Sequence, residues 1–467
     1  MAKEYKTPGV YIEEIPKFPP AVASVDTAIP AFIGYTEKAL ADDNSSLTFV
    51  ARKISSLLEY EKYFGFAPKE NTIAVSIIEA AGQPTAFSAV ITNPSVYQFY
   101  HELQMFFDNG GDDCYIISAG GYEMPGLIES TKLKEGLKVI EGIDEVTLIV
   151  FPDAISLTSK DAYYELFKES LLQCSRLQNR FTIMDVWIDT NTAIDNVEAL
   201  RNADLGTTNE LKYGAAYYPT LVSALIYNYD DAGVSVAHIS PAGDITHYNL
   251  AALAVSNPVY YTACKNEIQT LHPVLPVSPA IAGVYAMVDN TRGVWKAPAN
   301  INLVNIVHPL IVINDQQQRL LNIDAATGRS INSIRSFAGR GSSIVWGART
   351  LAGNDNEWRY IPVRRFMIMI EASVKKATEQ FVFEPNDAST WVKVKSMIED
   401  YLTQQWKAGA LMGSSTKKAY FVSCGLGETM TSQDILEGKM IVEIGMAVVR
   451  PAEFIILRFM HKMLQES

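Results

Sequence analysis

VTLIVFPD, residues 146–153, decides the fold class, because it is a short apolar run that ends in an acidic residue. A strand that is apolar on both faces must be covered on both, as in a buried parallel sheet. Helix-like stretches (residues 133–142, 162–177) flank it, and a second apolar strand, RFTIMDV (residues 180–186), follows. This alternation predicts an α/β layer from about residue 132 to about residue 270.

The composition is that of a folded protein with several domains. The chain has 467 residues, of which 48% are hydrophobic and 19% charged, enough for about three domains. Its net charge is -13 and no stretch is densely basic, so we expect no nucleic-acid partner. We expect no signal peptide and no direct membrane insertion, because no apolar run approaches about 20 residues. The four scattered cysteines favour reduced core thiols.

No motif for catalysis, cofactor binding or metal binding stands out. The chain has no phosphate loop, no H-E-x-x-H and no G-x-S-x-G. Asp153 and Asp185 follow strands, where α/β sheets often bind ligands, but neither precedes a glycine-rich loop. We interpret both as turn or capping residues. His101, upstream of a pair of aspartates and Cys114, is interpreted as structural. We therefore expect no catalytic, cofactor-binding or metal-binding residues, with an α/β enzyme using the middle segment as an alternative.

The two ends of the chain are candidate docking strands. Near the start, an apolar, β-branched run lies between Pro8-Gly9 and Pro16, and KFPP (residues 17–20) holds the next segment extended, which prevents a tight hairpin. Its backbone needs a distant segment or another chain as partner. Near the end, a strand predicted over residues 453–460 is apolar on both faces and must also be covered. The docking residues are Val10, Tyr11, Ile12, Glu13 and Ile15, then Phe454, Ile455, Ile456, Leu457 and Phe459.

Two amphipathic helices are predicted before the second docking strand. Apolar residues recur every three or four positions from Phe366 to Phe381, and again from Trp391 to Leu402, where Asp387 or Ser389 would cap the helix. The second helix leaves several charges outward, facing solvent or another subunit: Lys393, Lys395, Glu399 and Lys407.

Several long, irregular strings resemble the contractile tail sheath family of contractile-tailed phages and phage-like bacterial injection systems. Near the start these are YKTPGVYIEEI (5–15), AFIGYT (31–36) and FFDNGGDDCYIIS (106–118). The most specific ones follow: SPAIAGVYAMVDNTRGVWKAPAN (278–300), INSIRSFAGRGSSIVWGARTL (331–351), WRYIPVRRFMIMIEASV (358–374), FVFEPNDASTW (381–391) and WKAGALMG (406–413). The resemblance covers nearly all of residues 278–460, whereas the middle segment departs from the family.

The resemblance implies a multidomain α+β and α/β protein. A discontinuous α+β core domain (residues 21–125 and 278–450) would carry an inserted α/β outer domain (residues 126–277) and extended terminal β-strand arms (residues 1–20 and 451–467). The arms of adjacent subunits would meet in a small shared sheet on a third subunit.

The resemblance also implies a mechanical function. Subunits would polymerise as helically stacked sixfold rings around an inner tube, contact baseplate and terminal cap proteins, and contract without a nucleotide. The chain would be made in the bacterial cytoplasm and then become part of a virion or of an extracellular or cell-anchored particle. The helix over residues 388–408 is the first choice for contact with the inner tube, and residues 429–438 are the second. Another structural part of the particle, such as a baseplate or cap protein, is an alternative.

Overall fold

The structure is a computed structural model that describes residues 21–458 except 82–84, 124–125 and 189–192. The N-terminal docking strand (residues 10–15) and Phe459 lie outside the described residues. The described residues form two compact units: residues 26–369 with 450–458, and residues 370–449 with 21–25. Among the described residues, no helix is both long and apolar enough to cross a membrane.

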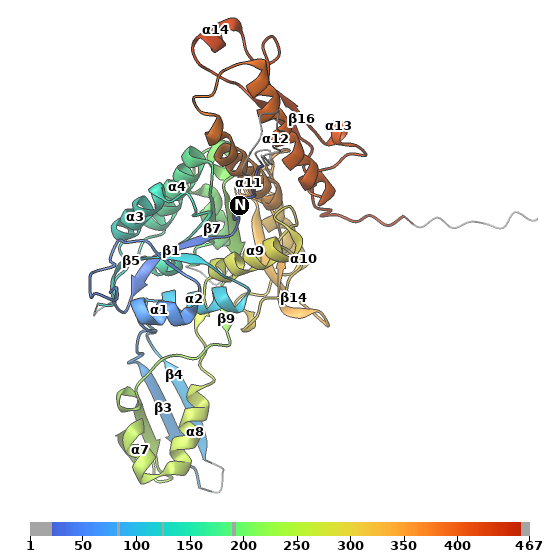
Figure 1. The fold of residues 1–467 in the computed structure, drawn as a ribbon. Coiled ribbons are helices and arrows are strands. Elements are labelled where there is room, and N and C mark those ends of the chain that lie inside the picture. Colours follow the sequence, from blue (N-terminus) through green and yellow to red (C-terminus); the bar gives the residue numbers. More distant parts are fainter. Residues whose placement is uncertain (1–20, 82–84, 124–125, 189–192, 459–467) are drawn as a thin grey trace, which may run out of the picture. The chain divides into compact units, whose positions relative to one another are not determined.

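The larger unit is built on an eight-stranded sheet with the order β15-β14-β8-β7-β6-β1-β5-β2 (Figure 1). Its six inner strands, from β14 to β5, are parallel, and the two edge strands are antiparallel. The α/β layer predicted from VTLIVFPD is confirmed, with β6 inside the sheet. The strands are β1 (Pro30–Thr36), β2 (Arg52–Ile54), β5 (Cys114–Gly121), β6 (Leu148–Val150), β7 (Phe181–Asp185), β8 (Gly214–Tyr218), β14 (Ile331–Phe337) and β15 (Gly341–Trp346).

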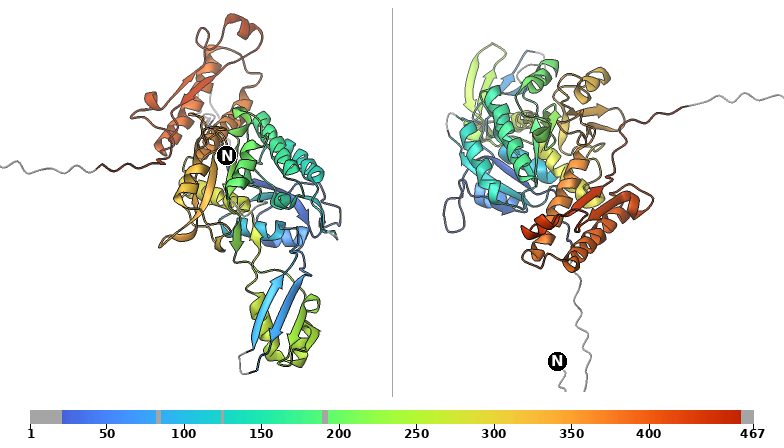
Figure 2. Two further views of the ribbon diagram at one scale, coloured as in Figure 1. Left: turned by 180° about the vertical axis from the view of Figure 1, so that it is seen from behind. Right: turned by 90° about the horizontal axis from the view of Figure 1, so that it is seen from above.

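Helices cover both faces of this sheet (Figures 1 and 2). On one face, helix α3 (Ser130–Val139) lies so close to β1 that a Cβ at Gly136 would stand 2.5 Å from the Ile33 side chain. On the other face, a Cβ at Gly34 would stand 2.9 Å from the Phe99 ring of α2 (Phe99–Asp108). Successive strand residues point to opposite faces, so α2 and α3 cover opposite sides. The parallel strands are therefore buried on both faces, as their sequence predicts.

The eight-stranded sheet takes strands from all three segments that were expected to form core and inserted domains. Strands β1, β2 and β5 come from residues 21–125, strands β6, β7 and β8 from 126–277, and strands β14 and β15 from 278–450. The middle segment thus supplies three inner strands of the shared sheet, since β6 pairs with β1 and β8 with β14. The boundaries at residues 125 and 277 stay a prediction.

A second sheet with its own hydrophobic core is formed by β3 (Ile73–Ile78), β4 (Ala86–Ile91), β10 (Ser235–Ile239) and β11 (Ile245–Asn249). Helices α7 (Leu250–Ser256) and α8 (Pro258–Ile268) contribute to this core (Figure 1). A three-stranded sheet joins β9 (Leu221–Ser223), β12 (Val274–Leu275) and β13 (Ile306–Pro309). The other helices of this unit are α1 (Leu57–Phe64), α4 (Lys160–Leu177), α5 (Ala193–Asn202), α6 (Thr208–Leu211), α9 (Ser278–Arg292) and α10 (Asp315–Asn322), with the 3-10 turns η1 (Ile140–Gly142), η2 (Pro152–Ser156) and η3 (Asp231–Gly233).

The smaller unit contains the two helices predicted from residues 366–402. Helix α11 (Ile361–Thr378) begins in the larger unit and is followed by η4 (Glu379–Phe381). Helix α12 (Ala388–Lys407) starts where the Asp387 carboxylate accepts the Thr390 amide at 3.0 Å, which confirms the predicted cap. The unit also holds α13 (Thr416–Ala419), β16 (Tyr420–Ser423), α14 (Ser432–Leu436) and β17 (Glu443–Met446).

Candidate functional site

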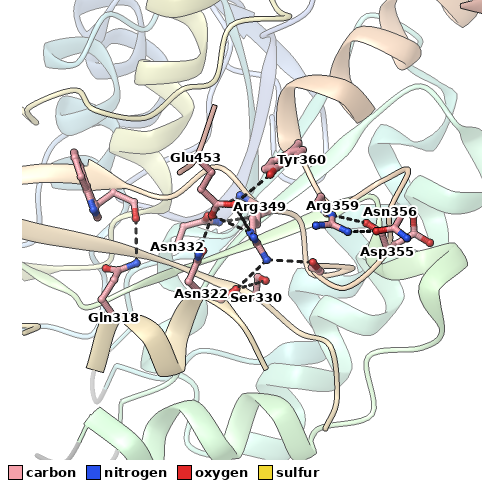
Figure 3. A network of polar contacts seen from close by, with 12 residues as sticks. Gln318, Asn322, Ser330, Asn332, Arg349, Asp355, Asn356, Arg359, Tyr360 and Glu453 are labelled. Atoms are coloured by element: carbon pink, nitrogen blue, oxygen red, sulfur yellow. Dashed lines mark hydrogen bonds and ion pairs between the residues drawn. The ribbon is translucent and has the colours of Figure 1, made fainter. Parts of the chain in front are cut away.

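The root of the C-terminal arm is a polar network centred on Glu453 (Figure 3). The Glu453 carboxylate accepts hydrogen bonds from Nε of Arg349 at 3.0 Å and from Nη2 at 2.6 Å. The side-chain amide of Asn322 donates to it at 2.7 Å and the Tyr360 hydroxyl at 3.2 Å. One carboxylate at the beginning of the arm is therefore held by three side chains of the larger unit.

The backbone of Arg349 is fixed by a single side chain of β14. The Asn332 amide accepts the Arg349 N–H at 2.8 Å and donates to the Arg349 carbonyl at 2.8 Å, so it imitates a strand partner. Arg349 also lies in an isolated antiparallel bridge with Tyr360. Both backbone polar groups of Arg349 are thus hydrogen-bonded, which holds its backbone in place. The guanidinium of Arg349 is directed from this fixed position toward the arm.

Charge and burial together make this contact strong. The side chain of Arg349 is 4% exposed and that of Glu453 is 20% exposed. Burial raises the pKa of the Glu453 carboxyl, but hydrogen bonds from Arg349 and Asn322 and the charge of Arg349 outweigh it, and the net pKa is lowered. Glu453 is thus ionised at neutral pH, as a bidentate Arg–carboxylate pair requires.

Beyond Glu453 the arm leaves its apolar side chains uncovered. Phe454, Ile455, Ile456 and Leu457 are 65–80% exposed, and residues 451–458 form no strand. The strand predicted over residues 453–460 is thus not formed by residues 453–458, the part of it that the structure describes. Four consecutive exposed apolar residues are unusual on a soluble surface and indicate a docking segment.

The smaller unit contains a sheet with only two strands among the described residues. Strand β16 pairs antiparallel with β17, with Phe421 opposite Gly445. A Cβ at Gly445 would stand 2.1 Å from the Phe421 ring, so the ring lies directly over the glycine. Two-stranded sheets are marginally stable in isolation, and additional strands complete them. This sheet is a candidate acceptor for an extended segment.

The whole chain matches solved structures of contractile particles. The structure of an extracellular contractile injection system, a PVC sheath complex in the contracted state, matches with 30% identity and a TM-score of 0.66, over 99% of both chains. The chain belongs to the contractile tail sheath family. A chain in the contracted baseplate structure of the anti-feeding prophage (AFP) matches this sheath protein with 26% identity and a TM-score of 0.69, over 98% of this chain and 99% of that chain.

The sequence matches to phage sheath proteins cover a part of the chain. The family model for the phage tail sheath C-terminal domain matches residues 353–461. The tail sheath protein of Vibrio phage KVP40 is 31% identical over 131 residues, which are 28% of this chain and 19% of the phage protein. The chain therefore aligns with about a fifth of the length of that curated relative.

The charged residues predicted to face an inner tube do not form one surface on α12. Lys393 and Lys407 are exposed, whereas Lys395 and Glu399 are half-buried. Lys395 and Glu399, four residues apart, share one side, but Lys393 and Lys395, two residues apart, point to different sides. In the second candidate segment, helix α14 is capped by Thr431 and leaves Leu436 82% exposed. Contact of either helix with a tube stays a prediction.

The two strand-end aspartates are helix caps, as predicted. The Asp153 carboxylate accepts the N–H of Gln98 at 2.7 Å and of Phe99 at 3.1 Å, at the start of α2. The Asp185 carboxylate accepts the N–H of Val277 at 2.7 Å and of Ser278 at 3.1 Å, at the start of α9. Burial raises the pKa of Asp153 to about 7 and that of Asp185 to about 6, although the amide donors oppose it. Both carboxylates are committed to holding helices on the sheet.

His101 is a buried structural residue in this sheath protein. Its Nε2 lies 3.2 Å from the Ile226 carbonyl, and burial lowers its pKa to about 4. Asp113, in the aspartate pair after α2, forms an ion pair with Lys53 at 3.0 Å. Among the described residues, no three His, Cys, Asp or Glu side chains are grouped to hold a metal ion.

The partnership of Arg349 and Glu453 was not predicted from the sequence. Both lie within residues 278–460, where the family resemblance is nearly continuous, but 104 positions separate them. The one local signal is a charged residue at the start of an apolar run, EFIIL (residues 453–457), which here marks the root of the arm.

Proposed function

We propose that this chain is the structural subunit of a contractile sheath. It polymerises as helically stacked hexameric rings around an inner tube and contracts to drive that tube through a target envelope. The match to a contracted sheath complex over 99% of both chains carries this proposal. The exposed apolar arm beyond Glu453 supports it, because such a segment needs a partner in the assembled particle.

Subunits are linked by strand addition. The docking residues of the C-terminal arm (residues 454–459) of one subunit and those of the N-terminal arm (residues 10–15) of another extend the β16–β17 sheet of a third. Backbone hydrogen bonds provide strength, and pockets for alternate side chains provide register. An anchored arm root and a two-stranded acceptor sheet are the features that this linkage needs.

Contraction in this proposal is a change of packing between subunits and uses no nucleotide. Because the arms stay engaged, the rotation of one ring pulls on the next, and the Glu453–Arg349 pair bears that pull within each subunit. A preference of about 5 kcal/mol per subunit is enough to reverse a two-state equilibrium. Larger interfaces in the contracted packing can supply it.

The partners are other copies of the chain, an inner tube protein, and baseplate and terminal cap proteins. Assembly takes place in the bacterial cytoplasm, and the product is a virion or an extracellular or cell-anchored particle. A baseplate component is a second candidate, favoured by the match to a chain in the AFP baseplate structure. An enzymatic use of the middle segment is disfavoured because Asp153 and Asp185 both serve as helix caps.

Negative-stain electron microscopy of the purified full chain, with sedimentation, tests the proposal. We expect hollow striated tubes or cogwheel-shaped rings from the chain alone or with its inner tube protein. Removal of residues 1–20 should leave a folded monomer that forms no tubes. Normal tubes from this truncated chain would refute strand exchange. A wild-type chain that stays monomeric in both conditions would refute the sheath assignment.

A further inference from the structure

A turn in the smaller unit places an aromatic residue where glycine is normally found. Residues 381–384 form a β-turn in which the Glu384 N–H donates to the Phe381 carbonyl at 3.1 Å. Val382 has φ -64° and ψ 130°, and Phe383 has φ 70°. These angles define a type II turn, whose third residue needs a positive φ and is usually Gly or Asn. A bulky residue in this conformation is strained.

The Phe383 side chain gains nothing from its own chain in return for this strain. It is 102% exposed, and its neighbour Val382 is 62% exposed, whereas Phe381 is only 9% exposed. Phe381 thus anchors the turn in the protein, whereas the side chains of Val382 and Phe383 point into solvent. Residues that combine backbone strain with full exposure indicate a function outside the single chain.

The residues that follow the turn are fixed by several hydrogen bonds. The Asn386 side chain donates to the Lys439 carbonyl at 2.9 Å and accepts from the Trp391 indole N–H at 2.7 Å. Asp387 caps α12, and its N–H donates to the Pro385 carbonyl at 3.0 Å. An aromatic residue on a fixed backbone loses less conformational entropy when it binds than one on a mobile loop, which suits an interface hot spot.

We propose that Phe383, with Val382, is a docking knob that inserts into an apolar site on a second copy of this chain. The proposal rests on the sheath function above. Copies that each carry a net charge of -13 repel one another, so their contacts need apolar surfaces or local charge complementarity. The knob offers an apolar tip with exposed acidic residues nearby in the sequence, Glu379, Glu384 and Asp387.

The same unit carries a surface that complements this knob. Met412 is 50% exposed, and Lys417 and Lys418 are exposed on α13. A Cβ at Gly413, next to Met412, would stand 2.9 Å from the Lys418 carbonyl carbon, so this surface is compact. Two different surface patches of one chain that bind each other make a heterologous contact, which generates rings or helices.

The variant Phe383→Gly separates assembly from folding, because glycine suits the turn better than phenylalanine does. We expect the critical concentration for assembly of the full chain to rise about 30-fold, the effect of losing an aromatic hot spot. Below that concentration, the thermal midpoint of F383G should be higher than that of the wild-type monomer, because glycine adopts the positive φ without strain. Val255→Ala, which truncates an 87% exposed valine on α7, is the control and should change neither quantity. A lowered midpoint for F383G would show packing within its own chain and overturn the proposal.

A charge exchange tests whether the receptor is the second copy. Glu384→Lys alone, and Lys417→Glu with Lys418→Glu, should each weaken assembly, and all three changes in one chain should restore it within about threefold of wild type. Failure of this rescue would refute the assigned receptor. Normal assembly of F383G would refute the knob. A defect of F383G that appears only when the chain assembles on the inner tube protein would also refute it. A wild-type chain without any assembly would instead refute the sheath function.

Discussion

Replacing Glu453 by glutamine tests the anchor of the C-terminal arm, because it removes the charge that Arg349 meets while keeping the side-chain size. Arg349 is 4% exposed, so solvent does not replace the lost charge. Its other acceptors, the carbonyls of Asn322 at 3.4 Å and Gly353 at 3.3 Å, are neutral and distant. The variant therefore leaves a buried guanidinium without a charged partner.

The magnitude follows from burial. Removing one partner of a buried ion pair costs about 3–5 kcal/mol. Because the Glu453 side chain is 20% exposed, solvent screens part of the interaction, and we expect about 2–3 kcal/mol. At 1.36 kcal/mol per tenfold change, the arm root detaches roughly 30- to 160-fold more often in the variant.

Hydrogen–deuterium exchange of residues 450–458 measures this detachment directly. Asn322→Ala removes one hydrogen bond and should give a smaller increase, about fivefold. The double variant Arg349→Met with Glu453→Met replaces the pair by apolar groups and should return exchange toward the wild-type rate. Unchanged exchange in E453Q, or an equal increase throughout the chain, would refute the anchor. In the wild-type chain the lowered pKa of Glu453 predicts that the anchor persists at neutral pH and weakens only below pH about 4.

Three further predictions concern other sites. Gly445→Val should push the Phe421 ring off β17 and abolish tubes while the chain stays folded, as seen by microscopy and circular dichroism; intact tubes would contradict this. Burial raises the pKa of Asp153 to about 7 from about 3.9 in the unfolded chain. The folded chain therefore binds the proton more tightly, and the free energy of unfolding should fall as the pH rises from about 4 to about 7. Asp153→Asn should flatten that slope in urea titrations, and an unchanged slope would refute it. Lys393→Glu should weaken binding to the inner tube protein about threefold at low salt. Lys395→Glu, on another side of α12, should not, and equal effects would exclude a directional contact.

Local patterns in the sequence were enough to predict single elements. The three- and four-residue spacing from Trp391 to Leu402, with Asp387 before it, predicts α12 and its cap because both depend on residues within one helical turn. Likewise the apolar run VTLIVF predicts a strand covered on both faces. Gly65, with φ 85°, ends α1, and a glycine directly after a helix is a local signal of the same kind.

Long-range relations could not be read in the same way. Strand β1 lies between β5 and β6, and β8 pairs with β14 more than 100 residues later, so no local pattern shows that three segments share one sheet. The partnership of Arg349 with Glu453 is equally distant in sequence. The turn at Phe383 was missed for another reason: a type II turn is recognised by glycine, which is absent here.

Docking of the arm needs both binding energy and a defined register. The apolar arm provides the first, and the polar root provides the second. An apolar arm gains binding energy from burial, but neighbouring apolar residues such as Ile455 and Ile456 resemble one another, so a strand can slip in register. A bidentate Arg–carboxylate pair has one geometry and fixes the position at which the arm leaves its own subunit. Because the pair fixes the arm at Glu453, a shift in strand register would leave the segment after Glu453 either too long or too short for the distance that it must span. We therefore expect the charge pair to set the register of docking, and E453Q tubes that do form should show irregular ring spacing.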